Sequence, residues 1–387
     1  MLQMKNKQSL FSNKNKGTLF SDEKKKRVIV AMSGGVDSSV AAALLKNQGY
    51  EVIGIFMKFW TEDNDKTDLV RENICCSLDA ATAARAVAQK LGIPFYVVNF
   101  ANEFKKAVVD YYIKEYEEGR TPNPCVICNR DIKGEVLLKK VLDLGGDYLA
   151  TGHYAQIKRK GGICHFYQGS DEKKDQSYFL WTLTQEKLAK MLFPVGNLAK
   201  PEVRDLARKM NLPTAERRES QGICFIPDRN VADFLRRHGK KLAKSGPILD
   251  KEGNVLGQHD GLINYTIGQR EHLGLGGPDA YYVLELDSRK NALVVGEDVD
   301  LFHKNLIVED VNWISPEFAK KEKAEVGGRI RYGHPIEDCV TIKVGSEYQV
   351  SFVKPQRAIT PGQSIVFYHK HEMVGGGIIK KINNQKD

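Results

Sequence analysis

The segment 28–40 constrains the fold of this chain more than any other part of the sequence. It opens with the apolar run Val28–Ala31, typical of a buried strand, and continues with Val36 and Val40 at the spacing of one helix face. Between the two halves lies Ser33–Gly35, where glycines let backbone N–H groups approach a ligand closely. The start of the helix adds a partial positive charge that suits phosphate. We therefore predict a strand, a phosphate-binding turn and a helix. The density of serine and glycine disfavours the alternative, an ordinary strand–turn–helix corner.

No Gly-Lys-Ser or Gly-Lys-Thr closes this turn, so it is not a Walker A loop. Without a lysine directed at the β- and γ-phosphates, the turn is better suited to holding a pyrophosphate that leaves as a unit than to moving a γ-phosphate. The run Ser-Gly-Gly-Val-Asp-Ser at 33–38 resembles the SGGxDS loop of the PP-loop ATP pyrophosphatases. Those enzymes cleave ATP to AMP and pyrophosphate to adenylate a substrate oxygen, so the resemblance implies ATP as a ligand.

Strand patterns alternate with helical patterns between residues 26 and 152. This alternation predicts an α/β fold with a doubly wound parallel sheet. Ligands of such sheets lie at the carboxyl ends of the strands, where the turn at Ser33 falls. Pro201 to Met210 predicts a further helix, which Pro213 ends. The predicted strands are Val28–Ala31, Val52–Met57, Phe95–Phe100 and Tyr148–Thr151, and the predicted helices are Val36–Asn47, Leu78–Leu91, Phe104–Glu117 and Lys133–Leu144.

After Phe225, glycines become frequent and short alternating runs replace the helices. The runs Tyr281–Leu286 and Ala292–Val295 flank a turn at 287–291 and predict a hairpin. Such short strands predict one or two small, mainly β domains or barrels. We divide the chain into a disordered basic arm (1–26), a PP-loop domain (27–225), a small β-rich domain (226–300) and a β-barrel-like domain (301–387). Further strands are predicted at Leu306–Val308, Ala324–Tyr332, Cys339–Val344, Gln349–Phe352 and Ser364–Tyr368.

The composition narrows the class of protein. A net charge of +9 favours a polyanionic partner such as nucleic acid. No apolar run approaches the ~18 residues that span a bilayer, so we expect no membrane partner. The first 27 residues have no apolar core of a secretory signal, and we interpret them as a basic arm, with an arginine-poor transit peptide as the alternative. Seven cysteines without such a signal indicate a reducing compartment, and we expect a cytoplasmic protein.

Two cysteines stand out by their context. Cys128 follows a segment whose prolines stop the preceding helix, and we expect a new helix to begin at 128–130. A helix start beside Arg130 would favour the thiolate of Cys128. Cys224 is expected in a glycine-preceded turn or strand, where a small core residue is the alternative.

The spacing Cys125-x-x-Cys128 also matches half of a zinc or iron–sulfur site, to which Cys75 and Cys76 would add ligands. A second pair with this spacing is missing, so the metal site is the weaker hypothesis. Cys164 and Cys339 lie among strand-like residues, and we predict structural roles for both.

Eight ordered runs between Val28 and Ile379 resemble the tRNA-specific 2-thiouridylases, a family within the PP-loop superfamily. The runs are GIFMKFW (54–60), GRTPNPCVICNR (119–130), ATGHY (150–154), KDQSYFL (174–180), LFPVG (192–196), GICFI (222–226), TIGQR (266–270) and TPGQS (360–364).

The resemblance implies a role for each matching position. Cys128 would be the nucleophile, and Cys224 would carry a persulfide. The ATP-binding residues would be Ala31, Met32, Ser33, Gly34, Gly35, Val36, Asp37, Ser38, Met57 and Gly152. Contacts with the target base and the tRNA would come from Asn123, Pro124, Cys125, His153, Lys174, Asp175, Gln176, Arg331, Tyr332 and Gln363.

Some of these positions have simpler interpretations or depart from the family pattern. His153 could be a hydrogen-bonded buried histidine, and Lys174 with Asp175 a solvated surface pair. Some family members carry Asp at the position of Cys125. Gly134 stands where the family usually has Phe, and we expect it to loosen the start of the helix.

The implied function is ATP-dependent 2-thiolation of uridine at the tRNA wobble position. The C2 oxygen would be adenylated with Mg²⁺ sharing the phosphate charge, and Asp37 is a candidate partner for that ion. The terminal sulfur of a Cys224 persulfide would then attack C2, or Cys128 would release it as sulfide. The expected partners are a tRNA with a wobble uridine and a persulfide donor, either a cysteine desulfurase or a relay protein.

Two other classes of function stay open on the sequence. Another PP-loop enzyme, such as a GMP or NAD synthetase, would need an amidotransferase Cys–His pair, for which we find no candidate. A non-catalytic RNA- or metal-binding protein would be expected to carry a damaged loop, whereas here 33–39 is intact.

Overall fold

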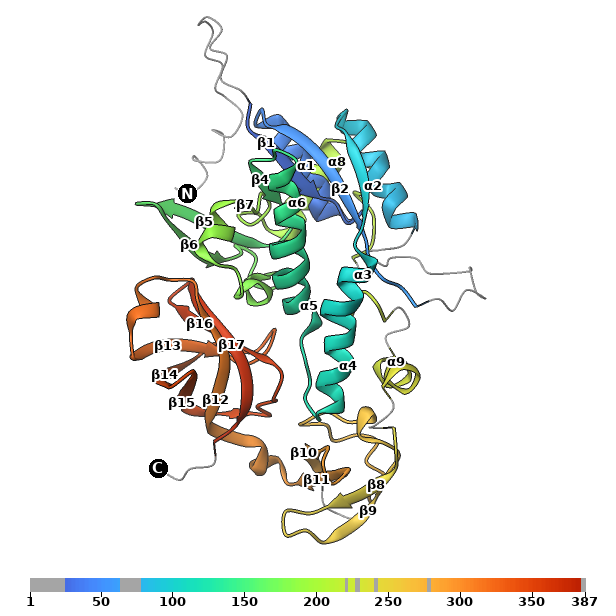
Figure 1. Cartoon of the computed structure of the whole chain (residues 1–387), viewed down its shortest axis with the longest axis vertical. Coiled ribbons are helices and arrows are strands. Elements are labelled where there is room, and N and C mark those ends of the chain that lie inside the picture. The colour runs from blue at the N-terminus through green and yellow to red at the C-terminus, as the bar shows by residue number, and fades with distance from the viewer. Residues whose placement is uncertain are drawn as a thin grey trace, which may run out of the picture.

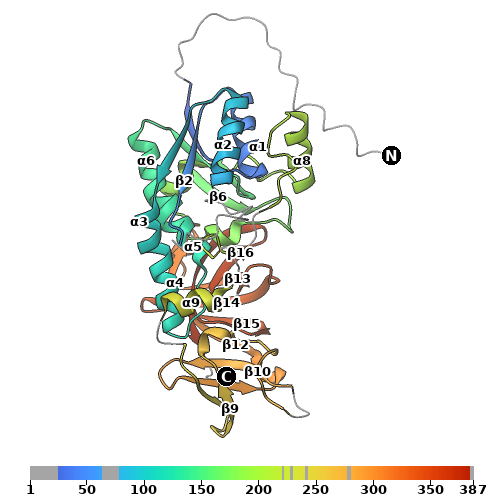
Figure 2. The same ribbon diagram turned by 90° about the vertical axis from the view of Figure 1, so that its right-hand side faces the viewer.

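The computed structural model describes residues 25–62, 78–219, 222–226, 230–239, 243–276 and 280–383. Figure 1 shows an elongated molecule in which a parallel sheet with its helices occupies one end. A small sheet lies at the other end, and a barrel lies between them. Figure 2 shows the same order along the long axis. The predicted basic arm lies almost wholly outside the described residues.

The parallel sheet confirms the predicted α/β fold. Its strands are ordered β3-β2-β1-β4-β7, and every neighbouring pair is parallel. Side chains alternate between its two faces, so Ile29 packs with Leu137 and Val141 while Val30 packs with residues of the helices on the opposite face. The strands are β1 (Arg27–Ala31), β2 (Glu51–Lys58), β3 (Phe95–Asn99), β4 (Tyr148–Ala150) and β7 (Met191–Leu192).

Two of the predicted helices have the expected bounds, α1 (Val36–Asn47) and α2 (Leu78–Leu91). The predicted helix from Pro201 is α8 (Lys200–Lys209). The predicted helix Phe104–Glu117 begins slightly earlier and contains a π-helical stretch. It consists of α3 (Ala101–Phe104), η1 (Lys105–Val109) and α4 (Asp110–Glu117).

The next helix begins at Pro124, before both of the predicted starts, which were Lys133 and the positions near Cys128. Asn123 caps it by accepting hydrogen bonds from the backbone of Cys125 and Val126, and Pro124 occupies the first turn. Gly134 therefore lies mid-helix, where a Cβ atom would come within 2.8 Å of the Asn129 carbonyl oxygen. Gly134 serves close packing and does not loosen a helix start. The helix consists of α5 (Pro124–Ile127), η2 (Cys128–Leu137) and α6 (Leu138–Asp143).

The C-terminal strands form a closed antiparallel barrel, because β12 pairs with β15 on one side and with β17 on the other. Its last strand is absent from the sequence prediction, since three consecutive glycines, 375–377, argue against a strand. A Cβ atom at Gly376 would meet the Trp181 ring at 2.8 Å, so packing requires glycine there. The strands are β12 (Phe302–Trp313), β13 (Lys323–Arg329), β14 (Glu337–Val344), β15 (Glu347–Arg357), β16 (Ser364–His369) and β17 (Glu372–Ile382).

A hairpin from the first half of the chain extends the barrel sheet. Strands β5 (Ala155–Lys160) and β6 (Ile163–Gln168) pair with each other, and Tyr167 of β6 pairs with Glu372 of β17. The sequence prediction missed this hairpin, although the pair Gly161–Gly162 between two alternating runs is a recognised hairpin signal.

The remaining small sheet has the order β10-β11-β8-β9, and its β10–β11 pair confirms the predicted hairpin. Its strands are β8 (Gly246–Leu249), β9 (Val255–His259), β10 (Tyr282–Asp287) and β11 (Ala292–Gly296). The other helical elements are η3 (Ser177–Leu180), α7 (Gln185–Ala189), α9 (Val231–His238), η4 (Leu262–Asn264), η5 (Asp298–Leu301) and η6 (Phe318–Lys320).

Candidate active site

The turn after β1 has the geometry of a phosphate-binding loop. Gly34 has a φ of +76°, and a Cβ atom at this position would overlap the carbonyl oxygen of Ala80. Gly35 is the N-cap of α1 and provides no side-chain cap, so the first N–H groups of the helix keep their partial positive charge for a ligand. Conformation and close approach thus require glycine at position 34, whereas Gly35 leaves the helix start without a side-chain cap.

The serines of the turn hold its shape. The Ser38 hydroxyl accepts a hydrogen bond from the Ser33 backbone at 3.2 Å and donates to the Gly35 carbonyl at 3.2 Å. Ser39 donates to the same carbonyl at 2.8 Å. Gly152 passes directly over the helix start, since a Cβ atom there would lie 2.6 Å from the Ser38 nitrogen. The predicted ATP-binding residues of the turn and Gly152 therefore lie together.

Asp37, in the first turn of α1, accepts hydrogen bonds from two other side chains. Lys200 of α8 donates to its two carboxylate oxygens at 2.7 and 2.8 Å, and the Tyr154 hydroxyl donates at 2.7 Å. Burial, together with the neighbouring Asp37 carboxylate, raises the pKa of the Tyr154 phenol. With three hydrogen bonds from two donor groups on its carboxylate, Asp37 does not fit the expected role of an Mg²⁺ ligand in this structure.

A cavity of about 290 Å³ joins the phosphate loop to the two predicted thiols. Cys128 and Cys224 lie 96 positions apart in sequence (224 − 128), yet both line this cavity together with Ser33. The structure therefore brings together one sulfur-bearing residue from the η2 helix, one from the turn at 222–226, and the loop that suits ATP. The lining residues are Met32, Ser33, Met57, Phe59, Phe104, Val108, Pro124, Cys125, Cys128, Asn129, Lys133, His153, Gln176, Phe179, Gly222, Ile223, Cys224 and Phe225.

Cys128 is buried and lies in the second turn of its helix, and the exposed Cys125 occupies the first. The expected neighbour Arg130 forms an ion pair with Asp131 at 2.7 Å. The nearby cation that does line the cavity is Lys133, which sequence reasoning did not single out. The sequence feature that could have indicated Lys133 is its position five residues after Cys128 on the same helix.

His153 lies between Lys133 and Thr151 at the wall of the cavity. Its Nε2 atom is 3.4 Å from the Lys133 ammonium, and its Nδ1 atom is 2.7 Å from the Thr151 hydroxyl. Burial and the Lys133 charge lower the pKa of His153 well below its usual value. A neutral ring that donates from Nδ1 and accepts at Nε2 satisfies both neighbours.

The run 174–176 divides into three different environments. Gln176 lines the cavity, and Lys174 donates to Glu219 at 2.7 Å. Asp175 is only 2% exposed, and its carboxylate accepts hydrogen bonds from Gly169, Gln168, Ser177 and Arg329. Because it faces inward and is fully engaged, Asp175 does not fit the expected direct contact with tRNA, nor a solvated surface pair.

The three predicted contacts from the C-terminal domain lie at its junction with the first domain. The ring of Tyr332 packs on Phe179, a cavity residue, with centroids 4.6 Å apart. Arg331 is half-buried beside it, and burial lowers the pKa of its guanidinium. The Gln363 amide donates to the Thr121 carbonyl at 2.7 Å, two residues before Asn123. Gln363 therefore borders the segment that leads to Cys128, and Tyr332 borders a residue of the cavity wall.

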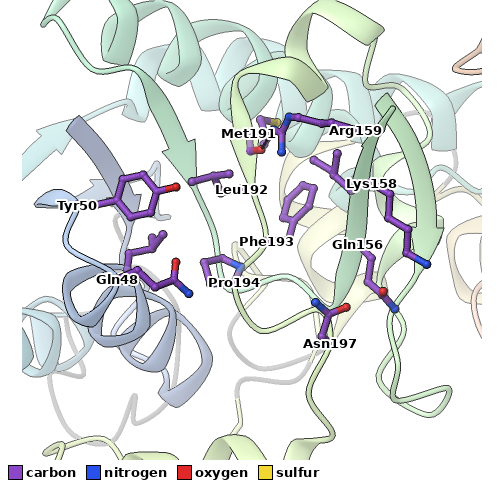
Figure 3. Close-up of a pocket in the computed structure, with 12 residues that line it drawn as sticks. Gln48, Tyr50, Gln156, Lys158, Arg159, Met191, Leu192, Phe193, Pro194 and Asn197 are labelled. Atoms are coloured by element: carbon purple, nitrogen blue, oxygen red, sulfur yellow. Dashed lines mark hydrogen bonds between the residues drawn. The ribbon is translucent and has the colours of Figure 1, made fainter. Parts of the chain in front are cut away.

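A second hollow, of about 200 Å³, contains none of the predicted site residues (Figure 3). Gln48 and Tyr50 form one side of this hollow. Arg159, which also lines it, donates hydrogen bonds to the Leu188 and Met191 carbonyls at 3.2 and 2.9 Å. We place the active site at the cavity with the cysteines, since the phosphate loop opens there.

Cys164 and Cys339 are buried in β6 and β14, as predicted for structural residues. Cys75 and Cys76 lie outside the described residues. Within the described ranges, no group of three or more His, Cys, Asp or Glu side chains is arranged to hold a metal ion. No helix in that same part of the chain is both long and apolar enough to cross a membrane.

The class of protein is defined by its domain order, a parallel sheet with a phosphate loop followed by two β domains. Three family models match the chain in this order. They are the tRNA methyl transferase HUP domain over residues 26–228, the tRNA methyl transferase PRC-barrel domain over 232–297, and the aminomethyltransferase beta-barrel domain over 303–379. Full-length relatives then identify the family. The chain belongs to the tRNA-specific 2-thiouridylases.

The tRNA-specific 2-thiouridylase MnmA of Geobacter metallireducens is 48% identical over 367 residues, covering 93% of this chain and 98% of the relative. The protein of the same name from Carboxydothermus hydrogenoformans is 48% identical over 362 residues, covering 92% and 98%. Among solved structures, a 4-thiouridine synthetase–RNA complex with bound ATP covers 55% of this chain and 50% of that chain, at 14% identity and a TM-score of 0.34.

Proposed function

We propose that this protein catalyses ATP-dependent 2-thiolation of uridine at the wobble position of tRNA. The C2 oxygen is adenylated and then replaced by sulfur from a persulfide on Cys224, giving 2-thiouridine, AMP and pyrophosphate. The observation that supports this best is the shared cavity of the phosphate loop, Cys128 and Cys224. Family membership supports the tRNA substrate.

Adenylation solves a chemical difficulty, because the C2 oxygen of uracil is a poor leaving group. The oxygen attacks the α-phosphorus of ATP, and the bond from that phosphorus to the bridging oxygen breaks with loss of pyrophosphate. The N–H groups at the start of α1 and the Ser33 hydroxyl would stabilise the charge that develops on the phosphates, while Ser38 holds the shape of the loop. We assign no step to an Mg²⁺ ion on Asp37, and propose that Mg²⁺ arrives with the ATP phosphates.

Sulfur transfer needs both cysteines. In one route the terminal sulfur of the Cys224 persulfide attacks C2 and AMP leaves. The Cys128 thiolate then attacks the Cys224 sulfur, which releases the thiocarbonyl and forms a Cys128–Cys224 disulfide. In the other route Cys128 attacks first and releases hydrosulfide, which displaces AMP. Both routes end with the same disulfide, and an external thiol reductant restores the two cysteines.

The tRNA has to present an unstacked base to this cavity. We propose that Asn123, Pro124 and Cys125 contact the base, and that His153, Lys174, Gln176, Arg331, Tyr332 and Gln363 lie along the tRNA. The exposed Cys125 and Tyr332 suit such contacts. A base that reacts inside a pocket must leave its stack, as in other enzymes acting on bases. We propose that the barrel domain, 301–387, provides much of the tRNA surface.

Two further proposals concern the surroundings of the enzyme. The Cys224 side chain is partly exposed, which suits delivery of a persulfide by a cysteine desulfurase or a relay protein. Two cysteines that must alternate between thiol and disulfide suit a reducing compartment, and we propose the cytoplasm.

The proposed function is tested by coupling ATP cleavage to the identity of the wobble base. The full chain is incubated with ATP and either a tRNA with wobble uridine or the same tRNA with wobble cytidine, and AMP and pyrophosphate are measured. We expect pyrophosphate release with the uridine tRNA only. Equal release with both tRNAs would contradict the proposed acceptor, and no release with either would favour a non-catalytic RNA-binding protein.

A further inference from the structure

The phosphate loop has no lysine of its own, but the fold brings one to it from α8. Lys200, the first residue of α8, is only 8% exposed, and its ammonium contacts both carboxylate oxygens of Asp37 at 2.7 and 2.8 Å. Asp37 is in the first turn of α1, where a phosphate would meet the helix N-terminus. The sequence separates the two residues by 163 positions, so the loop motif alone does not reveal this cation.

Lys200 is part of a cluster of cations that share one carboxylate. Glu219 accepts contacts from Lys200 at 3.2 Å, from Lys174 at 2.7 Å and from Arg204 at 3.9 Å. A carboxylate surrounded by three cationic side chains marks a place where an oxyanion is well accommodated. The cluster therefore has the character of an anion site, and it lies beside the start of α1.

Burying an ammonium group is unfavourable unless it is paired, and a purely structural contact between α1 and α8 would be served as well by apolar side chains. The charged arrangement is explained if the ammonium has a function at the phosphate loop. Asp37 and Tyr154 then act as positioning residues, since Asp37 holds the ammonium and the Tyr154 hydroxyl fixes Asp37 at 2.7 Å.

We infer that Lys200 binds the pyrophosphate leaving group of ATP and supplies the charge that the loop itself lacks. The inference rests on the proposed function, because it names a further residue of the same adenylation site. As the α-phosphorus bond breaks, the electron pair goes to the pyrophosphate oxygen, and Lys200 donates hydrogen bonds to that anion in place of Glu219. The step needs no proton transfer from Lys200 and no further reactant.

The test compares binding of ATP, AMP and inorganic pyrophosphate to the full chain by calorimetry. In Lys200→Gln the amide can still donate to Asp37, so the fold is expected to persist. We expect binding of ATP and of pyrophosphate to weaken about tenfold or more, because one charge-assisted contact is lost, and AMP binding to change by less than about twofold. Lys200→Arg, which keeps the charge, should recover part of the pyrophosphate affinity.

Arg208→Met is the matched control. It removes a cation from the same helix, where Arg208 pairs with Glu216 at the surface, and it should leave all three affinities unchanged. If Lys200→Gln binds pyrophosphate as tightly as the unmodified chain, or loses ATP and AMP affinity equally, the inference is wrong while the proposed function stands. If the unmodified chain binds neither ATP nor pyrophosphate, the proposed function itself fails.

Discussion

At the scale of single residues, the backbone of the phosphate loop determines which side chains it tolerates. Gly34 and Gly35 are adjacent, yet only Gly34 has a positive φ and only there would a Cβ atom overlap another backbone, that of Ala80. At Gly35 the nearest neighbour of a Cβ atom would be the Ser33 hydroxyl at 3.5 Å, an ordinary contact. The two glycines therefore respond differently to the same substitution.

We predict that Gly34→Ala lowers the free energy of unfolding by about 1–3 kcal/mol, since it combines backbone strain with overlap. Gly35→Ala is expected to cost less, on the order of 1 kcal/mol or below, through the weaker N-cap. Chemical denaturation of both variants measures the difference. An equal loss in both would show that the left-handed conformation of Gly34 is unimportant.

His153 makes a residue-scale prediction about pH. Burial and Lys133 hold its folded-state pKa below that of the unfolded chain, roughly 6.5, so between these values the unfolded state binds more protons. Its contribution to stability is complete above roughly pH 6.5 and is lost as the pH falls below that value. His153→Gln should flatten the fall in unfolding free energy by about 1 kcal/mol between pH 6.5 and 5.5. The same slope in both proteins would contradict the assignment of a neutral, half-buried ring.

At the scale of elements, local patterns predicted the parts of the fold that local chemistry determines. The strand β1, the turn and helix α1 follow from an apolar run, two glycines and one apolar helix face, and the parallel sheet follows from the alternation of strands and helices. The start of the helix that opens with α5 was misplaced because the Asn123–Pro124 cap was interpreted as part of a loop. Strand β17 was missed because its glycines are explained only by tertiary packing, against Trp313 at Gly375, Trp181 at Gly376 and Val308 at Gly377.

The contact between the barrel and the loop before Cys128 gives the element-scale prediction. Thr121 donates its N–H to the Pro361 carbonyl at 2.9 Å, and its own carbonyl accepts from Gln363 at 2.7 Å. A Cβ atom at Gly362, whose φ is +88°, would come within 3.0 Å of Arg120 and Thr121. The turn 361–363 therefore fixes this loop.

We predict that Gln363→Ala, even without tRNA, speeds amide hydrogen exchange in residues 119–127 several-fold and slows formation of 2-thiouridine. Mass spectrometry of the exchange measures the first effect. Gln258→Ala, which removes an exposed amide from β9, is the control and should change neither. If exchange in 119–127 stays the same while thiolation slows, Gln363 acts through tRNA alone.

At the scale of the whole molecule, the site combines segments that are distant in sequence. Cys128, Cys224, Lys200 and Tyr332 come from separate elements, and only the matching family motifs, not composition or periodicity, grouped the two cysteines. Lys200 and the buried position of Asp175 were beyond sequence reasoning, because a lysine or aspartate in a motif does not show which carboxylate or guanidinium it meets. Similarly, no local pattern indicates that β6 joins the barrel.

The elongated shape and the charge of +9 predict a binding mode for tRNA that depends on phosphate contacts. Lysine and arginine contacts with phosphates release counterions, and this release becomes less favourable as the salt concentration rises. Affinity for a wobble-uridine tRNA should therefore fall at least about tenfold between 50 and 200 mM salt. Filter binding over this range measures the slope. An affinity that does not change with salt would mean that apolar and base contacts dominate.

The central claim is that one cavity couples adenylation to sulfur transfer through Cys224 and Cys128. The most direct measurement is nucleoside analysis of a wobble-uridine tRNA after incubation with ATP, a persulfide donor and either the unmodified chain or Cys224→Ala. We predict 2-thiouridine with the unmodified chain and none with Cys224→Ala, while Cys164→Ala, a buried cysteine outside the site, still forms the product. Formation of 2-thiouridine by Cys224→Ala would contradict the account.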